Sequence, residues 1–145
     1  DSSTTTILAR SSENSNILAY AQVVAPSPLP AVSIASFYEK NDDSTTQGKT
    51  KLPPAVAPTM ELKRFYVDSQ AHGSGIAAML MDQVFVVARN QGKHEHVWLG
   101  VWEENPRAIS YYTKKAGFWQ VGTTVFVVGP DTQTDRVLVA AVPPV

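Results

Sequence analysis

The eight-residue stretch QAHGSGIA, residues 70–77, constrains this chain more than any other part of its sequence. It places Gly73 and Gly75 directly before an apolar pattern of helical period. Glycine permits backbone conformations that other residues avoid, and a helix N-terminus offers unpaired N–H groups and the positive end of the helix dipole. The stretch therefore predicts either a loop that binds a phosphate group or a glycine-rich turn that only begins a helix.

The pattern before and after this stretch alternates between strand and helix. Branched residues at 5–9 and 17–24 and the run MELKRFYV (60–67) predict three strands. Apolar residues then recur at helical spacing from Ile76 onward, and Gly92 is expected to follow the end of that helix.

The second half of the chain repeats this alternation. VWLGVW (97–102) predicts a buried strand, and Asn105-Pro106 predicts the cap and first turn of a helix that ends near Gly117. Two closing strands are expected around a turn at GPDTQTD (129–135). Three strands, a helix, a strand, a helix and two strands indicate the α/β class.

Length and composition limit the classes of protein that fit. The 145 residues predict one domain, with a proline-rich connection at about 26–58 that includes a short strand at AVSIASFY (31–38). The net charge of −1 argues against nucleic-acid partners, and the absence of a long apolar run argues against a membrane span. The chain has no cysteine and starts without a signal-peptide pattern, so a cytoplasmic location is expected.

Two well-known phosphate loops fit the glycine pair poorly. A Walker loop needs Lys and then Ser or Thr after its last glycine, whereas Ile76 follows Gly75. The relaxed dinucleotide fingerprint is satisfied by Gly73, Gly75 and Ala78, but polar residues separate the glycines from the preceding strand. Binding of NAD(H) therefore stays open as the outside alternative.

A third kind of phosphate-binding loop agrees with the whole predicted arrangement of a strand, a glycine loop and a helix. Gln-x-x-Gly-x-Gly at 70–75, followed by NPRAISYYTKKAGF at 105–118, resembles the GNAT superfamily of acetyl-CoA-dependent N-acetyltransferases over about residues 4–142. This resemblance implies a mixed sheet with flanking helices. It also implies that the family's usual first strand and first two helices are missing. Either the chain is a fragment, or the wall of its acceptor site comes from elsewhere.

The resemblance implies that acetyl-CoA is the co-substrate and that no metal takes part. The pyrophosphate would bind the loop, and the pantetheine arm would run along the strand before it. Asn105 also has a complete explanation as a helix cap, and Lys114 as a solvated residue. The residues expected to contact CoA are Phe65, Tyr66, Val67, Gln70, His72, Gly73, Ser74, Gly75, Ile76, Ala77, Asn105, Ala108, Tyr111 and Lys114.

Two residues are expected to carry the chemistry. The resemblance to histone acetyltransferases of this superfamily implies that Glu61 is the general base, although it also fits an exposed strand residue. Tyr112 is expected to donate to the departing sulfur. The spacing from Tyr112 to Gly117 is one residue longer than usual, so Tyr111 is the alternative. His94 and His96 indicate a surface turn rather than a metal site.

The acceptor is expected to be a small-molecule amine. GVWEENPRAISYY (100–112), followed by Gly-x-Asp-x-Gln-x-Asp at 129–135, is similar to PaiA-type spermidine/spermine acetyltransferases. This resemblance makes Asp131, Asp135, Glu103 and Glu104 candidates for receiving a cationic amine. Asp and Gly also suit any hairpin turn. A protein lysine or N-terminal acetyltransferase and a non-catalytic CoA-binding module stay open, and the resemblance also admits a homodimer.

Overall fold

A computed structural model describes residues 2–30 and 59–144 of the chain. The expected strand at AVSIASFY and most of the proline-rich connection lie outside these residues. The described part forms two compact units, one made of residues 2–28, 59–97 and 142–144, the other of residues 29–30 and 98–141. Its elements are β1 (Ser3–Arg10), β2 (Ile17–Ala25), β3 (Thr59–Val67), the 3-10 turn η2 (Ser69–Ala71), α2 (Ile76–Asn90), β4 (His96–Trp102), α3 (Pro106–Lys114), β5 (Trp119–Val128) and β6 (Asp131–Ala141). The predicted α/β class and the predicted order of elements are confirmed.

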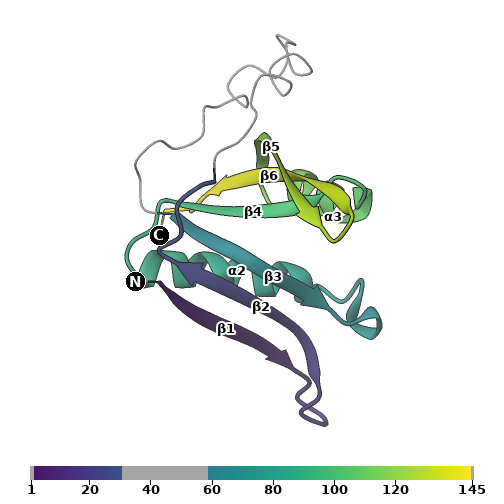
Figure 1. Ribbon diagram of the computed structural model, residues 1–145. Helices are drawn as coiled ribbons and strands as arrows, with labels where there is room; N and C mark the ends of the chain where they lie inside the picture. The colour runs from purple at the N-terminus through teal and green to yellow at the C-terminus, as the bar shows by residue number, and fades with distance from the viewer. Residues whose placement is uncertain (1, 31–58, 145) are drawn as a thin grey trace. The chain divides into compact units, whose positions relative to one another are not determined.

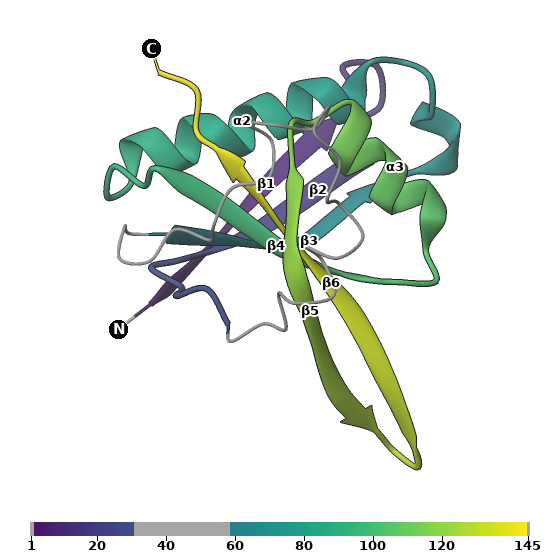
Figure 2. The same ribbon diagram turned by 90° about the horizontal axis from the view of Figure 1, so that it is seen from above.

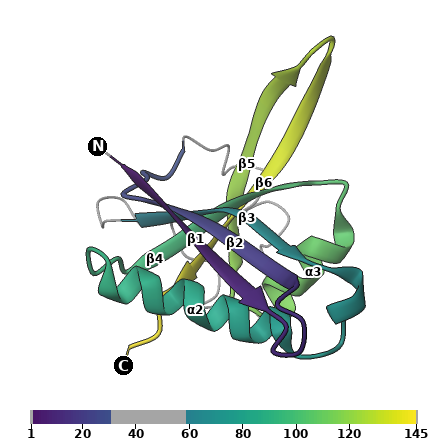
Figure 3. The ribbon, with the colours of Figure 1, turned by 90° about the horizontal axis from the view of Figure 1, so that it is seen from below.

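In the first unit, strands β1, β2 and β3 form an antiparallel meander (Figure 1). Along β2, Ala19, Ala21 and Val23 are buried, while the residues between them are partly exposed. This alternation puts one apolar face of the strands towards α2, which contacts all three of them and lies across that face in Figure 3.

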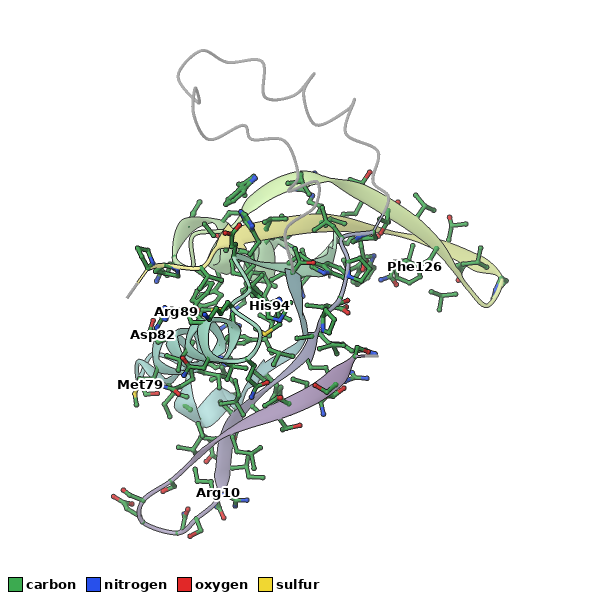
Figure 4. The ribbon with its side chains drawn as sticks, turned by 90° about the vertical axis from the view of Figure 1, so that its left-hand side faces the viewer. Arg10, Met79, Asp82, Arg89, His94 and Phe126 are labelled. Atoms are coloured by element: carbon green, nitrogen blue, oxygen red, sulfur yellow. The ribbon has the colours of Figure 1, made fainter. Side chains whose placement is uncertain are left out.

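Helix α2 follows from its apolar period. It buries residues spaced three and four apart, which are Leu80, Met81, Val84, Phe85 and Ala88. Its outer side carries Met79, Asp82 and Arg89, which Figure 4 shows along one side of the helix. The helix ends at Asn90, and Gly92 follows with a φ of +90°, so the predicted C-terminal glycine is confirmed.

The second unit contains most of β4 together with α3, β5 and β6. Here β6 lies between β4 and β5, and β5 is the last of the strands that the structure describes. A core of Trp98, Val121, Val137 and Val139 is covered by Leu29 and Trp119. Helix α3 contacts β5.

The hairpin of β5 and β6 differs from the expectation in one respect. The turn was predicted to occupy residues 129–135, whereas β6 already begins at Asp131 (Figure 2). Thr132 and Thr134 pair with Val127 and Val125 across the ladder. Branched side chains suit such cross-strand positions, so pairing extends the strands almost to Gly129. No helix among residues 2–30 and 59–144 is long and apolar enough to span a bilayer.

Candidate functional site

The loop before α2 is built from a tight turn and two glycines. Strand β3 ends at Val67, and η2 follows it with a hydrogen bond from Ala71 N to Asp68 O (2.8 Å). Gly73 and Gly75 then have φ of +80° and +87°, in the region that L residues rarely occupy. Ser74 Oγ donates to the Ala71 carbonyl and so ties the two glycines to the turn.

The surroundings of these glycines fit a phosphate group. A Cβ built on either Gly73 or Gly75 would meet no heavy atom within 4 Å, so the space beside the backbone is open. Gly75 is the N-cap of α2, and no acidic residue lies in the first turn of that helix. The first N–H groups of a helix have no partner within it, so an anion could approach them along the helix dipole.

The side chains of the predicted loop residues are mostly open to solvent. Gln70, His72 and Ser74 are exposed, as are the two glycines, and Ile76 and Ala77 are half-buried. The His72 ring lies with Nε2 3.0 Å from the carbonyl oxygen of Val67. This contact joins the loop to the end of β3.

Strand β3 carries the other predicted CoA contacts of the first unit. Phe65 and Val67 are half-buried, and Tyr66 is exposed. Tyr66 pairs with Tyr20 of β2, with ring centroids 5.6 Å apart.

Glu61 lies on β3 between two buried residues, Met60 and Leu62, so its side chain is on the opposite face from theirs. It is half-buried, and the hydroxyl of Ser27 donates a hydrogen bond to its Oε1 (3.3 Å). Ser27 is itself held by Thr59, because Ser27 N donates to Thr59 O (2.9 Å) and Thr59 Oγ1 donates to Ser27 O. Sequence reasoning missed Ser27, and no motif marks it.

The predicted residues of the second unit cluster on and around α3. Asn105 is its N-cap, and the side-chain oxygen accepts from the Ala108 N–H (3.3 Å). The capping interpretation is therefore confirmed for that oxygen. Lys114 is exposed in the last turn, where a positive charge favours the negative end of the helix dipole.

Tyr111 and Tyr112 differ in their surroundings although they are adjacent. The Tyr112 ring packs edge-on against Phe118, with centroids 5.6 Å apart, and Phe118 is buried. Tyr111 contacts the Tyr112 ring at the same centroid distance. Burial, with a smaller effect from Tyr111, raises the pKa of Tyr112 to about 12. The Tyr112 hydroxyl therefore stays protonated, and able to donate, at all physiological pH values.

The candidate acceptor carboxylates lie on β6 and on the segment after β4, which are joined where Glu103 N donates to Thr134 O (3.0 Å). Asp135 accepts a hydrogen bond from the amide of Gln133 (3.0 Å), and its Oδ2 would lie 3.3 Å from a Cβ on Gly100. Asp131 is exposed at the hairpin turn. Glu103 and Glu104 are exposed after β4.

The prediction of a surface turn at the histidines is wrong for His94. Its side chain is only 6% exposed, because the chain folds back after α2 with His94 N donating to Ala88 O (2.9 Å). The ring lies against Gly92, where a Cβ would be 2.9 Å from Nε2. No group of three or more His, Cys, Asp or Glu among the described residues is placed to hold a metal ion.

Sequence comparison places this chain among acetyltransferases. The model of the acetyltransferase (GNAT) family matches residues 12–118. An uncharacterized N-acetyltransferase of Mycobacterium bovis is 40% identical over 80 residues, which are 55% of this chain and 50% of the relative. One from Lactobacillus delbrueckii subsp. lactis is 33% identical over 82 residues, 54% of this chain and 44% of the relative. The chain thus spans about half the length of these curated relatives.

Solved structures show the same fold at low identity. Nourseothricin acetyltransferase has a TM-score of 0.64 at 18% identity, covering 97% of this chain and 66% of that one. A chimera of spermidine N-acetyltransferase SpeG from Vibrio cholerae and hSSAT has a TM-score of 0.60 at 14% identity, covering 95% and 67%. GNAT acetyltransferases use acetyl-CoA. With its glycine loop before α2 and a family match over residues 12–118, the chain belongs to the GNAT acetyltransferase family.

Proposed function

We propose that residues 1–145 form one N-acetyltransferase domain that moves an acetyl group from acetyl-CoA to a primary amine. The observation that carries this proposal is the open space beside Gly73 and Gly75 at the N-terminus of α2. Acetyl-CoA supplies the activated thioester. A cytoplasmic location and a homodimer are part of the same proposal, the former because acetyl-CoA is an intracellular metabolite.

The proposed CoA contacts fall into three sets. The backbone amides of His72 to Ala77 bind the pyrophosphate, with Gln70 beside them. The backbone of Phe65 to Val67 pairs with the pantetheine arm as a neighbouring strand would. The third set lies on the second unit and consists of Asn105, Ala108, Tyr111 and Lys114.

Direct attack requires a neutral amine, whose nitrogen forms the new C–N bond as the C–S bond breaks. Glu61 is the proposed base, either directly or through a water. The Ser27 hydroxyl donates to Oε1 and so orients the carboxylate, which leaves Oε2 to receive the proton. Ser27 is therefore a proposed positioning residue.

Tyr112 is the proposed donor to the departing sulfur. A cysteine thiol has a pKa of about 8.5, far below the pKa of about 12 for Tyr112. Complete proton transfer from this phenol to a thiolate would be unfavourable by a factor on the order of a thousand. Tyr112 therefore stabilises the developing thiolate by a hydrogen bond, and solvent supplies the proton afterwards.

A small cationic amine, such as a polyamine, is the proposed acceptor. The support is chemical: Asp131, Glu103 and Glu104 are exposed carboxylates on the second unit. The likeness to a spermidine acetyltransferase supports the fold alone.

An acceptor panel tests the function. Release of free CoA is measured with acetyl-CoA and spermidine, spermine, lysine-containing peptides or peptides with free N-termini. Turnover on polyamines supports the proposal, and preference for peptides would favour a protein acetyltransferase. CoA binding without turnover on any amine would favour a non-catalytic CoA-binding module. Binding of NAD(H) but not of CoA would overturn the proposed acetyl transfer.

The same assay tests Glu61. The value of kcat at saturating acetyl-CoA is measured against pH for wild type, Glu61→Gln and Ser27→Ala, with Glu13→Gln in the exposed β1–β2 turn as the control. We expect Glu61→Gln to lower the rate at neutral pH and to flatten the acid limb of the profile. Ser27→Ala should lower kcat and change KM less, because Ser27 is proposed to orient the base. The control variant Glu13→Gln should match wild type. Parallel profiles of equal height for wild type and Glu61→Gln would exclude Glu61 as the base.

A further inference from the structure

An exposed glycine interrupts a row of large side chains on β4. Leu99 and Val101 are buried, whereas Gly100 between them is exposed and so lies on the opposite face of the strand. Trp98 and Trp102 flank Gly100 on that same face, and the Trp102 side chain is 46% exposed. A glycine inside a strand contributes no side chain to the packing and often marks a close approach by another group.

That group is the carboxylate of Asp135 on the neighbouring strand β6 (Figure 1). A Cβ built on Gly100 would lie 3.3 Å from Asp135 Oδ2 and 3.9 Å from Asp135 Cβ, so the two residues face the same side of the sheet. Asp135 is half-buried, and its Oδ1 accepts a hydrogen bond from Gln133 Nε2 (3.0 Å). This bond orients the carboxylate so that Oδ2 lies beside the exposed backbone of Gly100.

Backbone pairing on both sides holds Asp135 in place. Glu103 N donates to the carbonyl oxygen of the preceding residue, Thr134 (3.0 Å), and Asp135 itself pairs with Thr124 of β5. Val137, two residues further along the same face, belongs to the buried core of this unit. The carboxylate is therefore a fixed negative charge beside apolar surface, where water screens it less than it would screen an exposed carboxylate.

We infer that Gly100, Trp102 and Asp135 form a subsite for a second, non-reacting ammonium group of the acceptor. The missing side chain of Gly100 admits the ammonium group to Asp135 Oδ2. The indole face of Trp102 is a second group on this face that attracts a cation. The inference rests on the proposed acetyl transfer and adds the residues that distinguish a diamine from a monoamine.

The chemistry of the reaction favours the second nitrogen over the reacting one. The reacting amine has to lose its proton before it attacks the thioester. A carboxylate beside that nitrogen would stabilise its protonated form and so oppose the attack. A nitrogen that keeps its proton throughout the reaction has no such conflict, so Asp135 can bind it equally well before and after the acetyl group moves.

The three other candidate carboxylates are less suited to this selection. Asp131, Glu103 and Glu104 are exposed, so water and salt screen their attraction for a cation. Asp135 is half-buried and held by a hydrogen bond. We therefore expect the selection of a diamine to depend on Asp135 more than on the other three.

Steady-state kinetics with 1,4-diaminobutane and n-butylamine test the subsite, because these amines share a four-carbon chain and differ only in the second amine. In wild type we expect the KM for the diamine to be lower by on the order of tenfold, as for a hydrogen bond to a charged group. Asp135→Asn should raise the KM for the diamine by about the same factor and leave the KM for butylamine unchanged. Asp82→Asn, at an exposed position on the outer side of α2, is the matched control and should behave as wild type.

Gly100→Ala tests the same subsite without removing the charge. Gly100 does not have a positive φ, so alanine fits the backbone, but its Cβ would occupy the space beside Asp135 Oδ2. We expect the KM for the diamine to rise, by less than in Asp135→Asn, with the KM for butylamine unchanged. Circular dichroism confirms that each variant is folded. An unchanged KM for the diamine in Gly100→Ala would overturn the placement of the ammonium group beside Gly100.

Calorimetric titration of the chain with 1,4-diaminobutane separates the subsite from the proposed function. Equal KM values for the two amines in wild type, or an equal rise for both in Asp135→Asn, would overturn the subsite and leave acetyl transfer standing. Binding of the diamine that Asp135→Asn abolishes, without turnover on any amine, would overturn acetyl transfer and leave the subsite standing. Neither binding nor turnover would overturn both.

Discussion

At the scale of single residues, Tyr112 is the side chain with the most distinctive environment on α3. It packs against buried Phe118, and its pKa is raised to about 12. For Tyr112→Phe we expect kcat to fall on the order of 100-fold with little change in the KM for acetyl-CoA, since the hydrogen bond strengthens only as sulfur leaves. Steady-state kinetics with one good amine measure both. A larger fall in kcat for Tyr111→Phe than for Tyr112→Phe would mean that Tyr111 is the functional tyrosine, as the longer spacing before Gly117 allows.

The same residue predicts a change in stability at high pH. The folded-state pKa of about 12 lies above the ordinary value of 10.0, so the folded chain keeps a proton that the unfolded chain loses. The contribution of this protonated hydroxyl to the free energy of unfolding is fully present below pH 10. It is lost as pH rises towards 12, by at most about 2–3 kcal/mol. Urea unfolding at several pH values between 9 and 11 should therefore show a steeper decline for wild type than for Tyr112→Phe. Equal slopes would contradict the raised pKa.

At the scale of elements, the prediction concerns the junction of the glycine loop and α2. In Gly75→Ala a Cβ would stand in the open space beside the backbone, and a φ of +87° would be strained for alanine by roughly 1–2 kcal/mol. We expect the affinity for CoA to fall at least about tenfold, a loss of about 1.4 kcal/mol of binding free energy. Isothermal titration calorimetry with CoA measures it.

The control for that experiment separates strain from binding. Gly129 also has a positive φ, +60°, and its Cβ would also meet nothing within 4 Å, but it lies in the β5–β6 turn. Gly129→Ala should lose comparable stability and keep the wild-type affinity for CoA. If both variants lost affinity equally, the effect of Gly75→Ala would reflect destabilisation, and the loop would have no special part in binding.

At the scale of the whole molecule, CoA should stabilise the folded chain. A ligand that binds only the native state at 100 times its Kd adds about 2.7 kcal/mol, which is a shift in Tm of about 5–10 °C for a protein of this size. Differential scanning fluorimetry with CoA, and with NAD(H) as the comparison, measures it. The absence of a shift at millimolar CoA would count against the proposed cofactor.

The sequence by itself determined the order of the elements and the position of the glycine loop before α2. Periodicity located α2, proline after Asn105 located the start of α3, and two glycines before an apolar helix marked the loop, because local backbone preferences fix such features. The match to residues 12–118 confirms the family that these motifs implied. The length of the β5–β6 turn was predicted wrongly, since cross-strand pairing of Thr132 and Thr134 outweighs the turn preference of their neighbours.

Only the tertiary structure decided which side chains meet across long separations. It brings Ser27 to Glu61, 34 positions away, and buries His94 against Gly92. It also shows that Tyr112 packs against Phe118, and that the apolar end of β5 is exposed and lies outside the core. A sequence pattern reports which side chains are apolar, whereas burial and hydrogen bonding depend on which strand is the neighbour. Strand order is set by the packing of the whole unit, which no local pattern encodes.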